Sequence, residues 1–353
     1  MSSQVEPRQI SYAEALLEAM RSEMARDPSV FVMGQGVDDP KGHYGTTMNL
    51  HKEFGAARSF DTPIAEESMT GVAIGAALNG MRPVHVHQRV DFLMLCMNQL
   101  VNMAAKMSYM FGGGVKVPIV VRAVIGRSWG QGAQHSQSLH GMLMHVPGLK
   151  VVVPSTPYDA KGCLIAAIRD NNPVIMIEHR MLYRMRGEVP DESYEVSIGK
   201  ARILREGTDV TVVAISHMVV EALRAIDLLE GKGVSVELID PISLSPLDNE
   251  TILRSVEKTR RLLIVDNDWT TAGASAEVLA VVAEAYQGWK SVQVKRLGYY
   301  PSPCPTTRPL EDAYYPDPLV IAEAVLGFFP GRALNGGEEI EERPELEEFK
   351  GPF

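Results

Sequence analysis

Three short apolar runs constrain the fold of this chain more than any other feature. They span residues 117–122, 149–154 and 173–178, and each is rich in valine or isoleucine. Strands that are buried on both faces read as such near-continuous apolar runs, and a helical pattern over residues 158–170 separates the last two. This alternation predicts an α/β fold in which helices cover both faces of a parallel sheet.

A second series of strands and helices follows a polar segment that has no periodicity. We predict strands at residues 209–215, 234–240, 261–266 and 291–297, and helical patterns separate them. A chain of 353 residues is long enough for two domains of ordinary size. We therefore predict two consecutive parallel-sheet α/β domains. The predicted bounds are 1–185 and 200–330 for the domains, 186–199 for a linker and 331–353 for an acidic tail.

The charge and cysteine content exclude several classes of protein. A net charge of −10 argues against a broad nucleic-acid-binding surface. Cys96, Cys163 and Cys304 are widely spaced and form no Cys-x-x-Cys pair, which indicates reduced thiols rather than a disulfide framework or a zinc site. The first 20 residues lack the apolar region of a signal peptide, and no apolar run approaches the ~20 residues that span a bilayer. We therefore expect a cytoplasmic protein.

Residues 60–77 combine a turn at Pro63 with a predicted helix that begins at two carboxylates, Glu66 and Glu67. In the first turn, the positive end of the helix dipole favours the ionised form of both side chains. A carboxylate held beneath a crevice at this point can accept a proton or a strong hydrogen bond from a bound ring. An ordinary acidic helix start has the same pattern, so the spacing alone leaves both interpretations open.

A polar, glycine-rich loop at residues 126–138 follows a predicted buried strand and contains His135 between Gln134 and Gln137. In an open α/β sheet, such a loop lies at the carboxyl edge, where ligands bind. A histidine there can donate or accept a proton near neutral pH. The alternative is a histidine that only fixes the loop through hydrogen bonds.

Motifs that bind phosphate or metal ions are absent from the sequence. There is no G-x-G-x-x-G or Walker pattern, no Gly-Asp-Gly with a downstream Asn for Mg²⁺ and a diphosphate, and no H-E-x-x-H. Glu66 and His135 are therefore a candidate acid and a candidate histidine without a phosphate or metal cradle. This combination indicates half of a site.

Several ordered segments carry a resemblance to a known family. They are DTPIAE at 61–66, RP at 82–83, NQLVN at 98–102, AAK at 104–106, GAQHSQ at 132–137, PGLKVV at 147–152, AKG at 160–162 and AIRDNNP at 167–173. Over residues 8–330 the chain resembles the β subunit of the thiamine-diphosphate-dependent E1 component of 2-oxoacid dehydrogenase complexes. The resemblance implies a transketolase-like pyrimidine-binding domain followed by a transketolase C-terminal-like domain.

The resemblance also implies roles for individual residues. Glu66 matches the glutamate that hydrogen-bonds N1′ of the aminopyrimidine ring and favours the tautomer whose nitrogen removes the thiazolium C2 proton. Phe92 matches the aromatic residue that stacks on this ring, and Ile64 and Gln35 match positions in the cofactor pocket. His135 matches the histidine that handles the substrate carboxylate or the acyl intermediate during transfer to lipoamide.

A structural potassium ion belongs to the same resemblance. In the family it is held by carbonyl and side-chain oxygens, which are the ligands that hard cations take. The matching residues in this chain are Ile119, Ala167, Ile168, Asp170 and Asn172.

The resemblance further implies partners. In the family, a separate α subunit holds the diphosphate and Mg²⁺, and the cofactor bridges the interface, which accounts for the missing phosphate cradle. We therefore expect an α2β2 heterotetramer that decarboxylates a small 2-oxo acid oxidatively and transfers the acyl group to the lipoyl group of E2, a dihydrolipoyl acyltransferase. No nucleic acid and no membrane are expected as partners.

Three departures from the family pattern leave alternatives open. Gln35 stands where the family usually has an acidic residue, residues 85–90 are more polar than usual, and residues 127–129 are bulkier and more basic. Arg89 and Arg127 either recognise the carboxylate of a polar substrate or lie at solvent or a subunit interface. Half of a split transketolase-like ketol transferase and a non-catalytic assembly subunit are the alternative functions. The motifs do not distinguish between 2-oxo acids.

Overall fold

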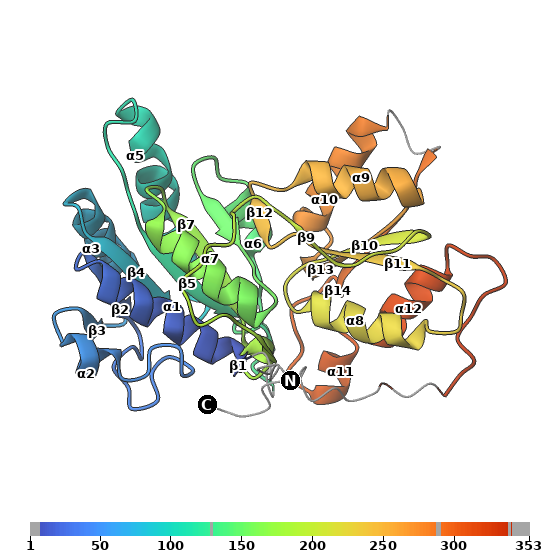
Figure 1. The fold of residues 1–353 in the computed structure, drawn as a ribbon, viewed down its shortest axis with the longest axis horizontal. Helices are drawn as coiled ribbons and strands as arrows, with labels where there is room; N and C mark the ends of the chain where they lie inside the picture. The colour runs from blue at the N-terminus through green and yellow to red at the C-terminus, as the bar shows by residue number, and fades with distance from the viewer. Residues whose placement is uncertain (1–7, 128–129, 287–290, 338–339, 341–353) are drawn as a thin grey trace, which may run out of the picture. The chain divides into compact units, whose positions relative to one another are not determined.

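The computed structural model of the chain describes residues 8–127, 130–286, 291–337 and 340. Within this part, contacts between residues define two compact units. The first comprises residues 8–125 and 146–198, and the second comprises residues 126–145 and 199–342 where described. Residues 126–145 therefore pack with the second unit, although they lie inside the predicted first domain. Figure 1 labels the elements of both units.

The first unit contains the parallel sheet that the apolar runs predict. Its strands pair side by side in the order β6-β7-β5-β4-β2-β3, and every pair is parallel. All residues of β2, β5 and β7 are buried, as expected for strands covered on both faces. The strands are β2 (Val30–Gly34), β3 (Ser59–Asp61), β4 (Arg82–His87), β5 (Val120–Ile125), β6 (Lys150–Val152) and β7 (Val174–His179).

Helix α1 of the first unit begins at a local sequence signal. At the start of α1, Ser11 and Glu14 form a reciprocal capping box: the Ser11 hydroxyl accepts from the Glu14 amide at 3.2 Å and the Glu14 carboxylate accepts from the Ser11 amide at 2.7 Å. Helices α1 and α7 lie side by side (Figure 1). The helices are α1 (Tyr12–Arg26), α2 (Leu50–Phe54), α3 (Glu66–Leu78), α4 (Val90–Leu93), α5 (Ala105–Met110) and α7 (Pro157–Arg169).

The sequence of residues 91–106 predicts a single helical run, but the structure divides it into shorter pieces. A 3₁₀ segment (Met94–Cys96) and a π-helical segment (Asn98–Ala104) separate α4 from α5. Within residues 94–104 the buried residues are Cys96, Leu100 and Ala104, which recur every four positions. Residues four positions apart drift around an α-helix, which has about 3.6 residues per turn. The π-helical segment has more residues per turn and offsets this drift.

Short elements also occur where no periodicity predicted them. Strand β1 (Gln9–Ser11) pairs antiparallel with β8 (Arg186–Glu188), which lies in the predicted linker. A further 3₁₀ turn (Arg180–Leu182) follows β7. Elements of three residues contain too little sequence to produce a recognisable period.

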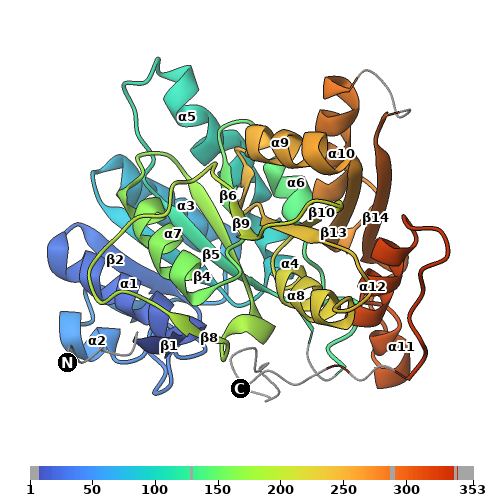
Figure 2. The same ribbon diagram turned by 45° about the vertical axis from the view of Figure 1, so that its right-hand side comes forward.

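The second unit is also an α/β sheet with helices on both faces. Its strands lie in the order β14-β13-β10-β11-β9. Helices α8 and α12 cover one face and α9 and α10 the other (Figure 2). The strands are β9 (Arg202–Arg205), β10 (Val210–Ala214), β11 (Val236–Asp240), β12 (Ser243–Ser245), β13 (Arg261–Trp269) and β14 (Gln293–Tyr299). The helices are α6 (His140–Met144), α8 (Met218–Leu228), α9 (Asn249–Thr259), α10 (Ala274–Ala285), α11 (Arg308–Asp312) and α12 (Pro318–Leu326).

The second sheet was predicted to be parallel, and it is parallel except for one strand at its edge. Edge strand β9 runs antiparallel to β11, with a register shift between Leu238 and Ile239. Its four residues are intermediate in burial or exposed, so β9 lacks the continuous apolar pattern of the buried strands. Most of the predicted acidic tail, residues 338–339 and 341–353, lies outside the described residues.

Two predictions from composition can be compared with the structure. Cys96, Cys163 and Cys304 are buried free thiols. Among the described residues, no helix combines the length and apolar character required to cross a bilayer.

Candidate active site

Glu66 lies where the sequence predicts it, at the first residue of α3. Its Oε1 accepts a hydrogen bond of 3.2 Å from Nε2 of Gln35, and Gln35 directly follows the last residue of β2. Both residues are partly exposed. Among the described residues, Gln35 is the one hydrogen-bond partner recorded for the Glu66 side chain. The second carboxylate oxygen can therefore accept a hydrogen bond from a ligand.

The backbone before Gln35 explains why this side chain reaches Glu66. Gly34 has φ +147°, and a Cβ there would lie 2.1 Å from the carbonyl oxygen of Val86, so a larger residue would push β2 away from β4. The amide of Gln35 donates to the same carbonyl at 3.3 Å, and Gln88 Nε2 donates to the carbonyl of Gln35 at 3.2 Å. Gln88 is thus part of the site, although no sequence motif marks it.

A pair of buried histidines lies beside the Glu66 end of α3. His85 and His87 project from the same face of β4, with ring centroids 4.2 Å apart. His85 Nδ1 lies 3.4 Å from the hydroxyl of Thr70, one helical turn after Glu66. Burial and the neighbouring His87 hold the pKa of His85 well below its usual value, although the charge of Glu66 opposes this. Burial also lowers the pKa of His87 to about 4, so both rings are neutral at neutral pH.

Phe92 and Ile64, the other predicted pocket residues, lie on surface elements of the first unit. Phe92 is partly exposed on α4, and the Ile64 side chain is 83% exposed just before α3. Beside Phe92, Arg89 is only 4% exposed, and its Nε donates to Asp91 at 3.3 Å. The Arg89 guanidinium therefore has a carboxylate partner within the chain, which favours a structural role over substrate recognition.

Two of the predicted potassium ligands, Ile168 and Asp170, accept hydrogen bonds from an arginine. Arg82 donates from one terminal nitrogen to the carbonyl oxygens of Ile168 and Asp170, both at 2.9 Å. Lys150 hydrogen-bonds the Asp170 carboxylate, whose other oxygen accepts from the Asn172 amide at 2.9 Å. A carbonyl oxygen has two lone pairs, so these oxygens fit a hard cation that shares them with Arg82. The Ile119 carbonyl accepts from Val174 at 3.0 Å, and Ala167 lies one residue before Ile168.

His135 belongs to the second unit, whereas the other predicted site residues belong to the first. Its ring is partly exposed, and its amide donates to the Gly132 carbonyl at 3.4 Å. Upstream, Arg127 pairs with Asp312 at 3.4 Å and lies over the ring of Tyr315 at 4.9 Å. Arg127 is thus engaged within the second unit. Residues 128 and 129 lie outside the described part of the chain.

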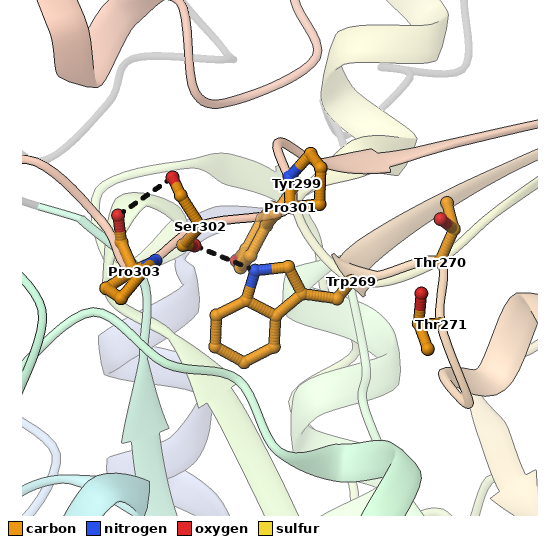
Figure 3. Close-up of a pocket in the computed structure, with 7 residues that line it drawn as sticks. All are labelled: Trp269, Thr270, Thr271, Tyr299, Pro301, Ser302 and Pro303. Carbon is orange, nitrogen blue, oxygen red and sulfur yellow. Dashed lines mark hydrogen bonds between the residues drawn. The ribbon is translucent and has the colours of Figure 1, made fainter.

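A shallow hollow of about 350 Å³ lies at the carboxyl ends of β13 and β14. Figure 3 shows the Trp269 indole on its wall, with Pro301, Ser302 and Pro303 on one side and Thr270 and Thr271 on the other. The indole nitrogen donates to the Ser302 carbonyl at 3.0 Å. No sequence pattern predicted this hollow, because its walls come from two segments about 30 residues apart.

The Gln35–Glu66 contact gives a direct prediction. Replacing Gln35 with glutamate puts two carboxylates within hydrogen-bond distance, and such a pair favours sharing one proton. We expect the acidic limb of the pH–rate profile to move to higher pH by about one unit or more in Gln35→Glu. Gln35→Met is the matched control, because it removes the hydrogen bond without adding a charge. Identical profiles for Gln35→Glu and the unmodified chain would contradict the proximity of the two side chains in the working enzyme.

Comparison with known families identifies both units. Residues 8–186 match the family model described as transketolase, pyrimidine binding domain, and residues 199–321 match transketolase, C-terminal domain. The β subunit of acetoin:2,6-dichlorophenolindophenol oxidoreductase of Bacillus subtilis (strain 168) is 42% identical over 340 residues, covering 93% of this chain and 99% of that one. The pyruvate dehydrogenase E1 component subunit beta of Gracilaria tenuistipitata var. liui is 42% identical over 312 residues, covering 88% and 97%.

A solved structure agrees on the fold. The chain superposes with a TM-score of 0.75 on a split gene transketolase described as an inactive beta4 tetramer, at 22% identity, covering 90% of this chain and 98% of that one. This confirms the two-domain α/β architecture. Together with the two relatives above, this structure shows that the similarity extends over both units of the chain. The chain therefore belongs to the family of transketolase-like E1 β subunits of 2-oxoacid dehydrogenases.

Proposed function

We propose that this chain is the catalytic β subunit of a thiamine-diphosphate-dependent E1 enzyme that decarboxylates a 2-oxo acid oxidatively. The acyl group is passed to the lipoyl group of an E2 dihydrolipoyl acyltransferase. The contact between Gln35 and Glu66 carries this proposal, because it presents an oriented carboxylate with one free oxygen at the edge of a pyrimidine-binding domain.

The residues of the first unit fit the aminopyrimidine half of the cofactor. When bound, thiamine diphosphate supplies a nucleophilic carbon and stabilises the negative charge left by decarboxylation. Glu66 holds a proton at N1′ of the pyrimidine through its free oxygen, and Gln35 keeps the carboxylate in place through the other. Phe92 and Ile64 contribute apolar walls. Neutral His85 adds hydrogen-bonding capacity near Glu66 without placing a second charge there.

The remaining parts of the site are assigned to other chains and to His135. The sequence has no cradle for a diphosphate, so an α subunit binds the diphosphate and Mg²⁺ in an α2β2 assembly. The relatives are themselves named as β subunits, which supports an α partner. His135 handles the substrate carboxylate or the acyl group during transfer, because a histidine can donate or accept a proton near neutral pH.

Reconstitution with the α subunit tests the proposal. We expect the co-expressed αβ enzyme to reduce 2,6-dichlorophenolindophenol when given thiamine diphosphate, Mg²⁺ and either pyruvate or 3-methyl-2-oxobutanoate. Dye reduction with acetoin alone, a hydroxyketone that has no carboxylate to lose, would instead indicate oxidative cleavage of acetoin. Acetoin is included because a relative is named for it. The chain alone should show little activity. Ketol transfer to an aldehyde without any electron acceptor would favour the split transketolase, and failure of the αβ complex to bind thiamine diphosphate would favour an assembly subunit.

We also propose that a potassium ion binds the loop that contains Asp170. The support is that two of the predicted ligands, the carbonyl oxygens of Ile168 and Asp170, converge on the same terminal nitrogen of Arg82. We expect the midpoint of thermal unfolding to be higher in 100 mM KCl than in 100 mM tetramethylammonium chloride, by about 2–4 °C for a stabilisation of about 1 kcal/mol. In Asp170→Asn this difference should shrink. Equal midpoints in the two salts for the unmodified chain would contradict the potassium site.

A further inference from the structure

The loop that carries His135 ends at a buried charged cluster. We define the His140 cluster as His140, the first residue of α6, with Asp266 and Asp268 of β13. His140 Nε2 lies 2.9 Å from Asp266 Oδ1 and 3.9 Å from Asp268 Oδ2. The side chains of His140 and Asp266 are completely buried, and that of Asp268 is 7% exposed. The proposed function gives no role to this buried cluster.

The carboxylates of the cluster are fixed independently of His140. Asp266 Oδ2 accepts from the Ser275 amide at 2.7 Å, at the N-terminal end of α10, where the helix dipole favours a negative charge. Asp268 Oδ1 accepts from the Trp269 amide at 2.8 Å. Because β13 is a central strand of the second sheet, both carboxylates belong to a rigid support. His140 is one of the groups that connect the loop to this support.

The charges of the cluster favour a protonated His140. Burial lowers the pKa of this imidazole, but the hydrogen bond to Asp266 and the charges of both aspartates outweigh burial and raise the pKa above its usual value. Burial also raises the pKa of Asp268. The buried hydrogen bond between His140 and Asp266 is costly to break, because each polar group would be left without compensation.

Nearby contacts hold the same end of the loop. Ser138 Oγ lies 2.8 Å from the hydroxyl of buried Tyr299, and Asn267 Nδ2 donates to Ser138 Oγ at 3.4 Å. A Cβ on Gly141 would lie 3.1 Å from the Ala272 carbonyl oxygen, so the backbone of α6 approaches residues 270–275 closely. His135 is only five residues from His140, so its position depends on these anchors.

We propose that His140 is a positioning residue for His135: its hydrogen bond to Asp266 fixes the end of the loop at residues 130–139 on strand β13. The effect on catalysis rests on the proposed function, whereas the effect on the loop is a property of this chain alone. Displacing a reacting group by about 1 Å can lower a rate about 10²-fold, so loosening the loop should act on kcat.

The test compares His140→Leu, His140→Gln and a matched control, His217→Leu. His217 is another buried histidine of the second unit, and it faces Glu221 at 3.6 Å but is not on the loop. Backbone hydrogen exchange of residues 130–139 is measured in the full chain, and kcat and KM are measured in the αβ enzyme, per bound thiamine diphosphate. Thermal midpoints are recorded for each variant.

We expect His140→Leu to speed exchange of the loop about tenfold or more and to lower kcat about tenfold, with KM changed less than twofold. His140→Gln, which can still donate to Asp266, should recover a large part of both losses. His217→Leu should lower the thermal midpoint but leave loop exchange and kcat unchanged. If His140→Leu does not fold, Asp266→Asn is compared with the same control and should give smaller changes of the same sign.

Two results would overturn the proposal. One is unchanged loop exchange in His140→Leu, and the other is an equal loss of kcat in His217→Leu, which would indicate a general effect of stability. Failure of the proposed function has a different signature: His135→Ala would retain full activity, while loop exchange would still respond to His140→Leu.

Discussion

Replacing Glu66 with glutamine should lower kcat of the αβ enzyme by about 10²- to 10⁴-fold, the usual contribution of a positioned proton donor or acceptor. Glutamine keeps the size of the side chain and can still meet Gln35, but its amide cannot hold a proton at N1′ as a carboxylate does. The measurement is 2-oxo-acid-dependent dye reduction, with thiamine diphosphate binding followed separately. Binding should weaken much less than kcat falls.

Glu67 supplies the control for this experiment. It lies next to Glu66 in the same helical turn, is exposed and accepts a hydrogen bond of 3.1 Å from Gln99. Glu67→Gln therefore removes a charge from the same helix start without touching the proposed cofactor contact. We expect its activity to stay within about twofold of the unmodified enzyme, because exposed charges near a helix terminus contribute little. Near-normal activity in Glu66→Gln would refute the mechanism.

Replacing Arg122 with methionine should destabilise the first unit by about 3–5 kcal/mol, because it leaves a buried carboxylate without its partner. Arg122 and Glu178 are each about 1% exposed and form two hydrogen bonds, of 2.5 and 2.9 Å. The same guanidinium donates to Thr46 at 2.8 Å, and the Tyr183 hydroxyl donates to Glu178 at 3.0 Å. Urea unfolding of the chain, followed by circular dichroism, measures the change.

Two further variants distinguish burial from charge pairing in general. Arg21 and Glu53 form an ion pair of 3.0 Å whose side chains are 39% and 46% exposed, so Arg21→Met should cost less than about 1 kcal/mol. In the double variant Arg122→Met, Glu178→Met, the unpaired charge is gone, and much of the lost stability should return. Equal losses for Arg21→Met and Arg122→Met would contradict this account of the buried pair.

The sequence predicted those parts of the fold that depend on local patterns. The runs that became β5, β6 and β7 are apolar because helices cover both faces of the sheet, and the capping box at Ser11 is complete within four residues. The antiparallel strand β9 was missed because its residues are only half-buried. The division of residues 91–106 was missed because the identities of these residues are compatible with an unbroken helix.

The same distinction applies to the candidate site. Glu66 could be placed at a helix start because two carboxylates follow a turn, but its contact with Gln35 joins residues 31 positions apart. The partner of Arg127 was equally invisible, since it is an aspartate 185 positions away. The partner of Arg89, by contrast, is Asp91, only two positions away. Side chains that meet only after folding leave no periodicity in the sequence, so their geometry had to come from the structure.

Residues 126–145 belong to the second unit but precede the rest of that unit in the sequence. They are therefore synthesised before the residues they pack against. His140 precedes Asp266 by 126 positions, and Ser138 precedes Tyr299 by 161. At a translation rate of roughly 5–20 residues per second, the loop waits on the order of ten seconds for these anchors. The first sheet can form in that time, but Asp266 and Tyr299, the anchors of the loop that contains His135, have not yet been synthesised. If His140 positions His135 as we propose, a chain that stops before β13 would carry Glu66 on a completed helix but would lack the anchors of the loop that contains His135.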